Sequence, residues 1–255
     1  MSTPLKVWFD ADGRLLRLRL SAPKANLIDA VMIAALSTAL AEHGGNSRLG
    51  AVLLDADGPH FSFGASVAEH LPERCAAMLA GLHALILRMI ESPVPILVAV
   101  HGQCLGGGLE LALAGHLLFV APDANLAQPE MQLGVFAPAA SCLLPELIGP
   151  QRAFDLLVSG RGVTGTEAAA LGIAKEAAAE PGRAALAYFD EYLKPRSAQS
   201  LRHAVRAARL DYVARVKIKL AAVEHLYLNE LMATRDAVEG LEAFLSKRPA
   251  QWEHR

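Results

Sequence analysis

Short apolar runs alternate with longer helical patterns along the first part of the chain, and this alternation constrains the fold more than any other feature. The runs AVLLD (residues 51–55) and PILVAV (residues 95–100) are bounded by Gly and Pro, as buried strands are. Residues 72–92, between them, have the length and spacing of a helix, and residues 28–45 form another helical pattern that ends at a glycine pair. Residues 14–20 alternate Leu and Arg with period two, which predicts a strand with one face in solvent. Strand and helix in alternation predict an α/β fold.

After Pro195 the strand signals stop and only helical patterns follow. The chain is therefore expected to divide into an α/β core, residues 1–195, and an all-helical C-terminal segment, residues 196–255. The last helix carries an apolar face whose members follow three-and-four spacing: Val238, Leu241, Phe244 and Leu245. A face of this kind on a terminal helix requires cover, either from the chain's own core or from another subunit.

Charge and cysteine content exclude several classes of protein. The 255 residues include 24 Lys and Arg against 26 Asp and Glu, so no global charge favours nucleic acid or an anionic membrane. The three cysteines have no C-x-x-C spacing, which is typical of reduced thiols, and the histidines lack the spacing of metal ligands. No leader or membrane-spanning pattern is found. We therefore expect a cytoplasmic protein that binds neither a metal, nor nucleic acid, nor a membrane.

Three glycines and an acid interrupt the apolar stretch HGQCLGGGLELALAG, residues 101–115. Gly106, Gly107 and Gly108 at a strand-to-helix turn let the backbone approach a ligand and leave N–H groups free to bind negative charge. Their spacing fits no nucleotide-phosphate loop, which favours an oxygen that becomes negative during a reaction; close helix packing explains a glycine run equally well. Glu110 favours the functional interpretation, because an acid among Leu and Ala is costly to bury.

Two further segments carry candidate chemistry. Glu130, in NLAQPEMQLGVFAP, is either a first-turn acid at a helix start or the partner of Glu110 in a carboxylate pair. Such a pair can take a proton from water with one group and deliver a proton to carbon with the other. In HFSFGASVAEHL, residues 60–71, an isolated glycine marks either an ordinary tight turn or a second backbone N–H, from Ala65, that faces the N–H of Gly107.

The chain resembles the crotonase, or enoyl-CoA hydratase/isomerase, superfamily over essentially its whole length. The resemblance rests on the combination of PKANLID, FSFGAS, PVPILVAVHGQCLGGGLELALAG, QPEMQLGV and the tail RDAVEGLEAFLSKRPAQW, no one of which is specific alone. It implies the family's ββα superhelix core, an oxyanion hole formed by the N–H groups of Ala65 and Gly107, and catalytic Glu110 and Glu130. Both acids together are typical of a hydratase, because members that only move a double bond usually keep the second acid alone.

Several residues differ from the common pattern of the superfamily and indicate one group within it. FAPAASCLLP replaces a glycine-rich run after LGV, and Ser66 and His116 stand where Asp is common. The whole set is most similar to the cyclohexa-1,5-diene-1-carbonyl-CoA hydratases of anaerobic benzoyl-CoA degradation. The acyl pocket is accordingly expected to be lined by these residues: Phe63, Ser66, Val67, Gly106, Gly108, Phe136, Pro138 and Ser141. The resemblance also implies that the basic side chains of Lys24, Lys247 and Arg248 lie near CoA phosphates, and that Lys247 and Arg248 approach the CoA of an adjacent subunit. The alternative for Lys247 and Arg248 is a solvated helix end.

The resemblance implies a hydro-lyase that adds water to a conjugated acyl-CoA thioester. For the cyclic diene, 1,4-addition gives 6-hydroxycyclohex-1-ene-1-carbonyl-CoA, and no cofactor is implied because coenzyme A is part of the substrate. The family's similar tail mediates trimers and hexamers, so we expect a homo-oligomer. The same residues are compatible with a linear enoyl-CoA hydratase, an isomerase, a thioester hydrolase or an acyl-CoA-binding assembly subunit. The sequence leaves open which glutamate is the base.

Overall fold

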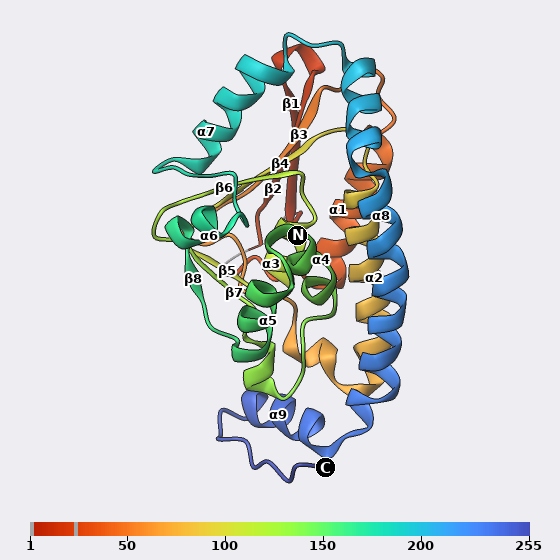
Figure 1. The fold of residues 1–255 in the computed structure, drawn as a ribbon, viewed down its shortest axis with the longest axis vertical. Coiled ribbons are helices and arrows are strands. Elements are labelled where there is room, and N and C mark those ends of the chain that lie inside the picture. Colours follow the sequence, from red (N-terminus) through yellow and green to blue (C-terminus); the bar gives the residue numbers. More distant parts are fainter. Residues whose placement is uncertain (1–2, 23–24) are drawn as a thin grey trace.

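The computed structural model describes residues 3–22 and 25–255 and is built around two sheets (Figure 1). The larger sheet has six strands in the order β1-β2-β3-β4-β6-β9, with β1 antiparallel to β2 and the other neighbours parallel. The smaller sheet has the order β5-β7-β8. The strands are β1 Leu5–Asp10, β2 Leu15–Leu20, β3 Ala51–Ala56, β4 Ile96–Val100, β5 Gln103–Leu105, β6 Leu117–Val120, β7 Asn125–Ala127, β8 Val163–Thr164 and β9 Glu176–Ala177.

Helices cover both faces of the larger sheet. They are α1 Ala30–His43, α2 Pro72–Ile90, α3 Gly107–Leu113, α4 Pro138–Ile148, α5 Pro150–Ser159, α6 Gly165–Leu171, α7 Pro181–Tyr188, α8 Ala198–Asn229 and α9 Arg235–Leu245. Figure 1 shows α8 running beside α2 along one flank, while α7 packs against β4 and β6 on the other side. None of the described helices has both the length and the apolar character needed to cross a membrane.

The central strands are buried on both faces, as their unbroken apolar runs predict. On β3 and β4, Val52 and Val98 face the main core, whereas Leu53 and Leu97 face a second core that Phe189 completes. Alternate side chains of a strand point to opposite faces, so a strand covered on both sides must be apolar throughout. The predicted α/β class is confirmed.

The prediction that β2 has one face in solvent is wrong. Arg17 is only 7% exposed. Its guanidinium donates to Asp55 at 2.9 Å and to Asp10 at 3.0 Å, and it lies over the ring of Trp8, 5.0 Å from the centroid. The alternating pattern predicted that the charge of this guanidinium lies in solvent. Instead, the two carboxylates and the indole stabilise the charge inside the protein.

The chain winds so that successive turns give a strand to each sheet. β4 leads into β5 and then α3, and β6 leads into β7 and then the 3-10 helix Pro129–Leu133. One turn earlier, β3 leads into Ser62, which forms an isolated parallel bridge with Cys104 of β5. This repeat is the ββα superhelix expected from the resemblance.

The C-terminal segment is mostly helical from residue 198 to residue 245 and packs on its own chain. α8 packs against α2 and α4, and α9 packs against the 3-10 helices Val67–His70 and Pro129–Leu133. Leu241 on the predicted apolar face is fully buried, whereas Phe244 is 55% exposed. The chain's own core therefore covers part of that face.

Candidate active site

Three segments that carry candidate residues lie side by side because the short strands before them are paired. Ser62 bridges to Cys104 of β5, and β5 pairs in parallel with β7. Ala65 lies three residues after Ser62, Gly107 two residues after β5, and Glu130 three residues after β7. The ladder of the smaller sheet thus brings residues from three turns of the superhelix to one place.

The backbone N–H groups of Ala65 and Gly107 lie close together in the wall of a cavity. An ideal Cβ on Gly107 would lie 3.1 Å from the nitrogen of Ala65. Gly64 and Gly106 have φ angles of 99° and 50°, which glycine adopts at low cost. Within the described residues, neither N–H donates to a protein acceptor. Two free donors in one wall can stabilise an oxygen that gains negative charge.

Gly108 does not line the cavity and serves packing instead. An ideal Cβ on Gly108 would lie 2.6 Å from Cβ and Oγ of Ser62, whose side chain is fully buried. Ser62 Oγ donates to the carbonyl of Asn26 at 2.7 Å and accepts from the N–H of Gly64 at 3.0 Å. The glycine run therefore has both of the roles that the sequence left open. Gly107 lies in the cavity wall, and Gly108 allows close packing of the helix.

Glu110 on α3 is 3% exposed and lines the cavity. Its Oε1 accepts a hydrogen bond of 2.9 Å from the N–H of Ala140, in the first turn of α4. Burial raises the pKa of Glu110, and the amides of Ala140 and Ala139 and the charge of His83 oppose that rise. The acid that interrupts the apolar pattern is thus buried with defined partners.

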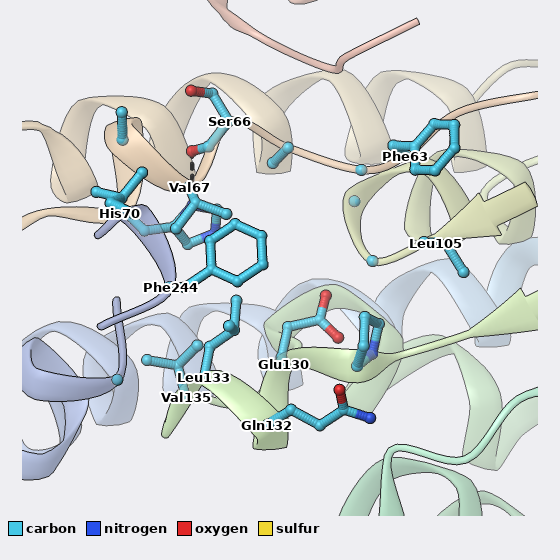
Figure 2. Close-up of a pocket in the computed structure, with 18 of the residues that line it drawn as sticks. Phe63, Ser66, Val67, His70, Leu105, Glu130, Gln132, Leu133, Val135 and Phe244 are labelled. Atoms are coloured by element: carbon cyan, nitrogen blue, oxygen red, sulfur yellow. Dashed lines mark hydrogen bonds between the residues drawn. The ribbon is translucent and has the colours of Figure 1, made fainter. Parts of the chain in front are cut away.

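Glu130 enters the same cavity from the 3-10 helix Pro129–Leu133, as Figure 2 shows. Burial, followed by the charge of Glu110, raises the pKa of Glu130 to about 8. Gln128 is 2% exposed, and its amide nitrogen, turned toward Glu130, donates to both carboxylate oxygens at 3.1 Å. Two carboxylates in one low-dielectric site titrate as a pair, so one proton is retained near neutral pH. Such a pair can accept one proton and donate another.

Gln128 is a site residue that the sequence predictions missed. Its only signal is a polar side chain directly before Pro129 and Glu130, which is typical of many loops. Its burial, and hence its contact with Glu130, follows from the pairing of β7 with β5.

The cavity has a volume of about 770 Å³ and collects most of the predicted site residues. Those in its wall are Phe63, Ala65, Ser66, Val67, Gly106, Gly107, Glu110, Glu130, Phe136, Pro138 and Arg248. Ser141 and Lys247 lie outside the wall together with Gly108, and Lys24 lies outside the described residues. Ser141 is turned back toward α4, because its Oγ donates to the carbonyl of Ala137 at 2.7 Å.

Apolar side chains from distant elements complete the cavity. Leu79 and Leu82 come from α2, and Phe244 comes from α9. In Figure 2, Phe63 lies on the right of the view, Glu130 lies below the centre, and Phe244 lies to the left of Glu130. Leu79, Leu82 and Phe244 were not predicted as cavity residues, because nothing local in the sequence places α2 or α9 beside the glycine turn.

The C-terminal residues return along their own chain. The N–H groups of Glu253 and His254 donate to Asp236 at 2.7 and 2.8 Å. Arg248 lines this chain's cavity and is paired with Glu239, with Nη2 2.7 Å from Oε2. The resemblance had associated this cation with the CoA of an adjacent subunit; here it lies at the site of its own chain.

Similar proteins share this fold. The family model for enoyl-CoA hydratase/isomerase matches residues 10–255. Cyclohexa-1,5-dienecarbonyl-CoA hydratase of Thauera aromatica is 63% identical over 254 residues, covering 100% of this chain and 98% of that protein. A probable enoyl-CoA hydratase of Bacillus subtilis (strain 168) is 33% identical over 246 residues, covering 92% and 93%. The crystal structure of an enoyl-CoA hydratase from Mycobacterium avium has a TM-score of 0.86 at 23% identity, covers 99% of this chain and 100% of that one, and shows the shared fold. The chain belongs to the enoyl-CoA hydratase/isomerase family.

Proposed function

We propose that this chain is a hydro-lyase that adds water to a cyclic conjugated thioester, cyclohexa-1,5-diene-1-carbonyl-CoA, and forms 6-hydroxycyclohex-1-ene-1-carbonyl-CoA. The observation that carries the proposal is the meeting of two buried carboxylates, Glu110 and Glu130, with the free N–H groups of Ala65 and Gly107 in one cavity. The relative from Thauera aromatica, 63% identical over the whole chain, supports the choice of the cyclic diene.

The two N–H groups bind the thioester oxygen. As water adds to the conjugated system, negative charge moves onto that oxygen, and the donors of Ala65 and Gly107 stabilise it. Loss of one such donor typically costs about 3 kcal/mol of transition-state stabilisation. Because both donors are backbone groups fixed by the ladder of the smaller sheet, they need no reorganisation during the reaction.

The two carboxylates divide the proton transfers. Glu110 takes a proton from water, whose hydroxyl adds to the ring carbon β to the carbonyl. Glu130, which keeps its proton up to about pH 8, gives that proton to the far end of the diene. Water thus adds across the four-carbon unit, and one carbon–carbon double bond remains, conjugated with the thioester.

The proposed reaction uses carboxylates and amides alone, and coenzyme A enters as part of the substrate, so we propose no metal and no further cofactor. Among the described residues, no three His, Cys, Asp or Glu side chains gather as metal ligands do. We further propose a trimer or hexamer in the cytoplasm, without nucleic acid or membrane partners.

The test compares acyl-CoA esters in parallel. Cyclohexadienoyl-CoA, crotonyl-CoA and a ten-carbon linear enoyl-CoA are each mixed with the protein, and ultraviolet absorbance, product mass and free thiol are followed. We expect the cyclic ester to gain the mass of one water and the long linear ester to react far more slowly. Overfilling a rigid pocket costs about 1–3 kcal/mol, or roughly 5- to 150-fold in kcat/KM.

The other outcomes identify the alternatives. Isomerisation would leave the mass unchanged, and hydrolysis would release free thiol. Equal kcat/KM for the ten-carbon ester would exclude the cyclic substrate as the specific one. Binding without turnover of any ester would indicate an acyl-CoA-binding subunit.

A further inference from the structure

Residues 246–255, which we call the strap, leave α9 and loop back beside it at the bottom of Figure 1. The strap returns to the start of α9, where the N–H of Arg235 donates to the carbonyl of Arg255 at 2.9 Å. Residues 248–250 of the strap lie in the wall of the cavity. The strap therefore connects the cavity with the outer side of α9.

Two acids of α9 hold the strap on both sides of Trp252. Oε1 of Glu239 accepts a hydrogen bond of 2.8 Å from the N–H of Gln251. Oδ1 of Asp236 accepts one of 2.7 Å from the N–H of Glu253. Hydrogen bonds to a carboxylate are stronger than those between neutral groups, so the backbone that carries Trp252 is fixed to α9.

The indole of Trp252 packs on two glycines that belong to different segments. Gly134 directly follows the 3-10 helix Pro129–Leu133, and Gly240 lies on α9. An ideal Cβ on Gly134 would lie 2.9 Å from Cζ3 of Trp252, and an ideal Cβ on Gly240 would lie 2.9 Å from Cη2 of the same ring. One aromatic ring thus fills the space of two missing side chains and joins α9 to the end of the helix that carries Glu130.

The 3-10 helix Pro129–Leu133 is too short to fix Glu130 by itself. Its last hydrogen bonds are long: the N–H of Gly134 donates to the carbonyl of Met131 at 3.3 Å, and the N–H of Val135 donates to the carbonyl of Glu130 at 3.2 Å. Short 3-10 helices have poor hydrogen-bond geometry in general. The position of the acid therefore depends on the segments that pack against this helix, and α9 is one of them.

We propose that Trp252 is a positioning residue for the hydration: its indole, held to α9 on both sides, packs on Gly134 and so keeps Glu130 where it can deliver its proton to the substrate ring. The inference rests on the proposed function. Trp252 is 42% exposed and lies outside the cavity wall, so it neither fills the core nor meets the substrate. It acts on the reaction through the backbone of the 3-10 helix.

The test compares turnover with ligand binding in Trp252→Ala. This variant loses the ring but keeps the hydrogen bonds on both sides of it, because backbone N–H groups donate them. We expect kcat with cyclohexadienoyl-CoA to fall about 10- to 100-fold, because a shift of about 1 Å in a reacting group can cost that much. The Kd of cyclohexanecarbonyl-CoA, a saturated ester, should change little, because residues 248–250 stay in the cavity wall. Trp252→Phe keeps an aromatic ring and should recover most of kcat.

Trp8→Ala is the matched control, because Trp8 is the other tryptophan of the chain. It lies on β1, outside the cavity wall, and the guanidinium of Arg17 lies over its ring, 5.0 Å from the centroid. The control removes a side chain of the same size without touching the 3-10 helix of Glu130. We expect lower stability and the kcat of the wild-type protein.

A folded Trp252→Ala variant, checked by circular dichroism, that keeps the kcat of the wild-type protein overturns the inference. An equal loss of kcat in Trp8→Ala also overturns it, since the loss would then follow from weaker folding in general. If Trp252→Ala does not fold, Trp252→Leu decides, and an unchanged kcat again overturns the inference. Wild-type protein that does not hydrate the dienoyl ester contradicts the proposed function itself, and that failure is visible before any variant is compared.

Discussion

Glu110 and Glu130 carry the same chemical group, and their surroundings make them different. Burial raises the pKa of Glu110, and the hydrogen bond that it accepts from Ala140 at the start of α4 opposes this rise. Glu130 is buried near Glu110 and keeps its proton up to about pH 8. The proposed addition of water requires one base and one acid at the same pH, and different surroundings allow two glutamates to take these two roles.

Replacing either acid by its amide tests its role. Glu110→Gln and Glu130→Gln keep the shape and remove ionisation, so each should lower kcat by at least about 100-fold, with far smaller change in the Kd of a saturated CoA ester. Glu146→Gln is the control, because Glu146 is an acid on α4 that lies outside the cavity wall and pairs with Arg215. Near-wild-type hydration by either site variant would remove that residue from the mechanism.

The raised pKa of Glu130 also predicts how stability depends on pH. An exposed glutamate in the unfolded chain loses its proton near pH 4.5, whereas folded Glu130 holds it to about pH 8. Between these pH values the folded chain binds more protons than the unfolded chain, so the free energy of unfolding of the wild-type protein falls as pH rises. Glu130→Gln has no carboxyl group at this position, so its free energy of unfolding does not fall for this reason. We expect the stability advantage of the variant to grow by about 3–4 kcal/mol from pH 5 to pH 8.

Thermal midpoints of both proteins, measured at one concentration at pH 5 and pH 8, check this dependence. The same difference in Tm at both pH values would mean that the environment of Glu130 does not hold its proton.

At the scale of elements, α3 and the two turns beside it behave as one unit. Gly108 lets α3 approach Ser62, and Ser62 in turn fixes the turn that carries Ala65. The distance between the two amides therefore depends on a contact outside the cavity. The sequence could not show that Gly107 and Gly108 have different roles, because both belong to one glycine run. Only the contact of Ser62 with Gly108 distinguishes them.

Gly108→Ala should disturb this unit. The added Cβ has no room beside Ser62, which is fully buried, so we expect a stability loss of about 1–3 kcal/mol and lower kcat as the amides separate. Gly45→Ala is the matched control, since an ideal Cβ there meets nothing within 4 Å. Denaturant midpoints and turnover of both variants check the prediction, and a Gly108→Ala protein as stable and active as the control would refute the proposed coupling.

At the scale of the whole molecule, the C-terminal helices close the cavity and leave apolar surface elsewhere. Leu241 is buried against the core, and Phe244 enters the cavity wall. Leu210 and Ile218 on α8 are each 76% exposed, and Phe154 on α5 is 66% exposed. Apolar side chains of this size in solvent favour a covering surface on another subunit.

We therefore expect the full-length protein to be a trimer or a dimer of trimers at low micromolar concentration. Truncation after Pro195 should give insoluble or monomeric, inactive protein, because it uncovers the core that Val216, Leu220 and Leu241 now shield. Light scattering, together with activity of the same sample, decides, and an active full-length monomer would contradict the predicted assembly.

The sequence by itself determined what depends on neighbouring residues. The runs that became β3 and β4, the helix between them and the helical tail follow from periodicity and from Gly and Pro at their ends. The resemblance likewise located Glu110, Glu130 and the turns at Ala65 and Gly107, which the structure brings into one cavity.

Only the tertiary structure decided what depends on packing between distant segments. It buried Arg17 against the ring of Trp8, although the alternating pattern had predicted that this side chain lies in solvent. It also folded α9 onto its own chain, where the sequence allowed either its own core or another subunit. It also joined His83 to Glu224 across 141 positions of sequence. Periodicity reports which face of an element is apolar, but it does not report which element covers that face, because the free energy of that choice comes from contacts that exist only after the chain has folded.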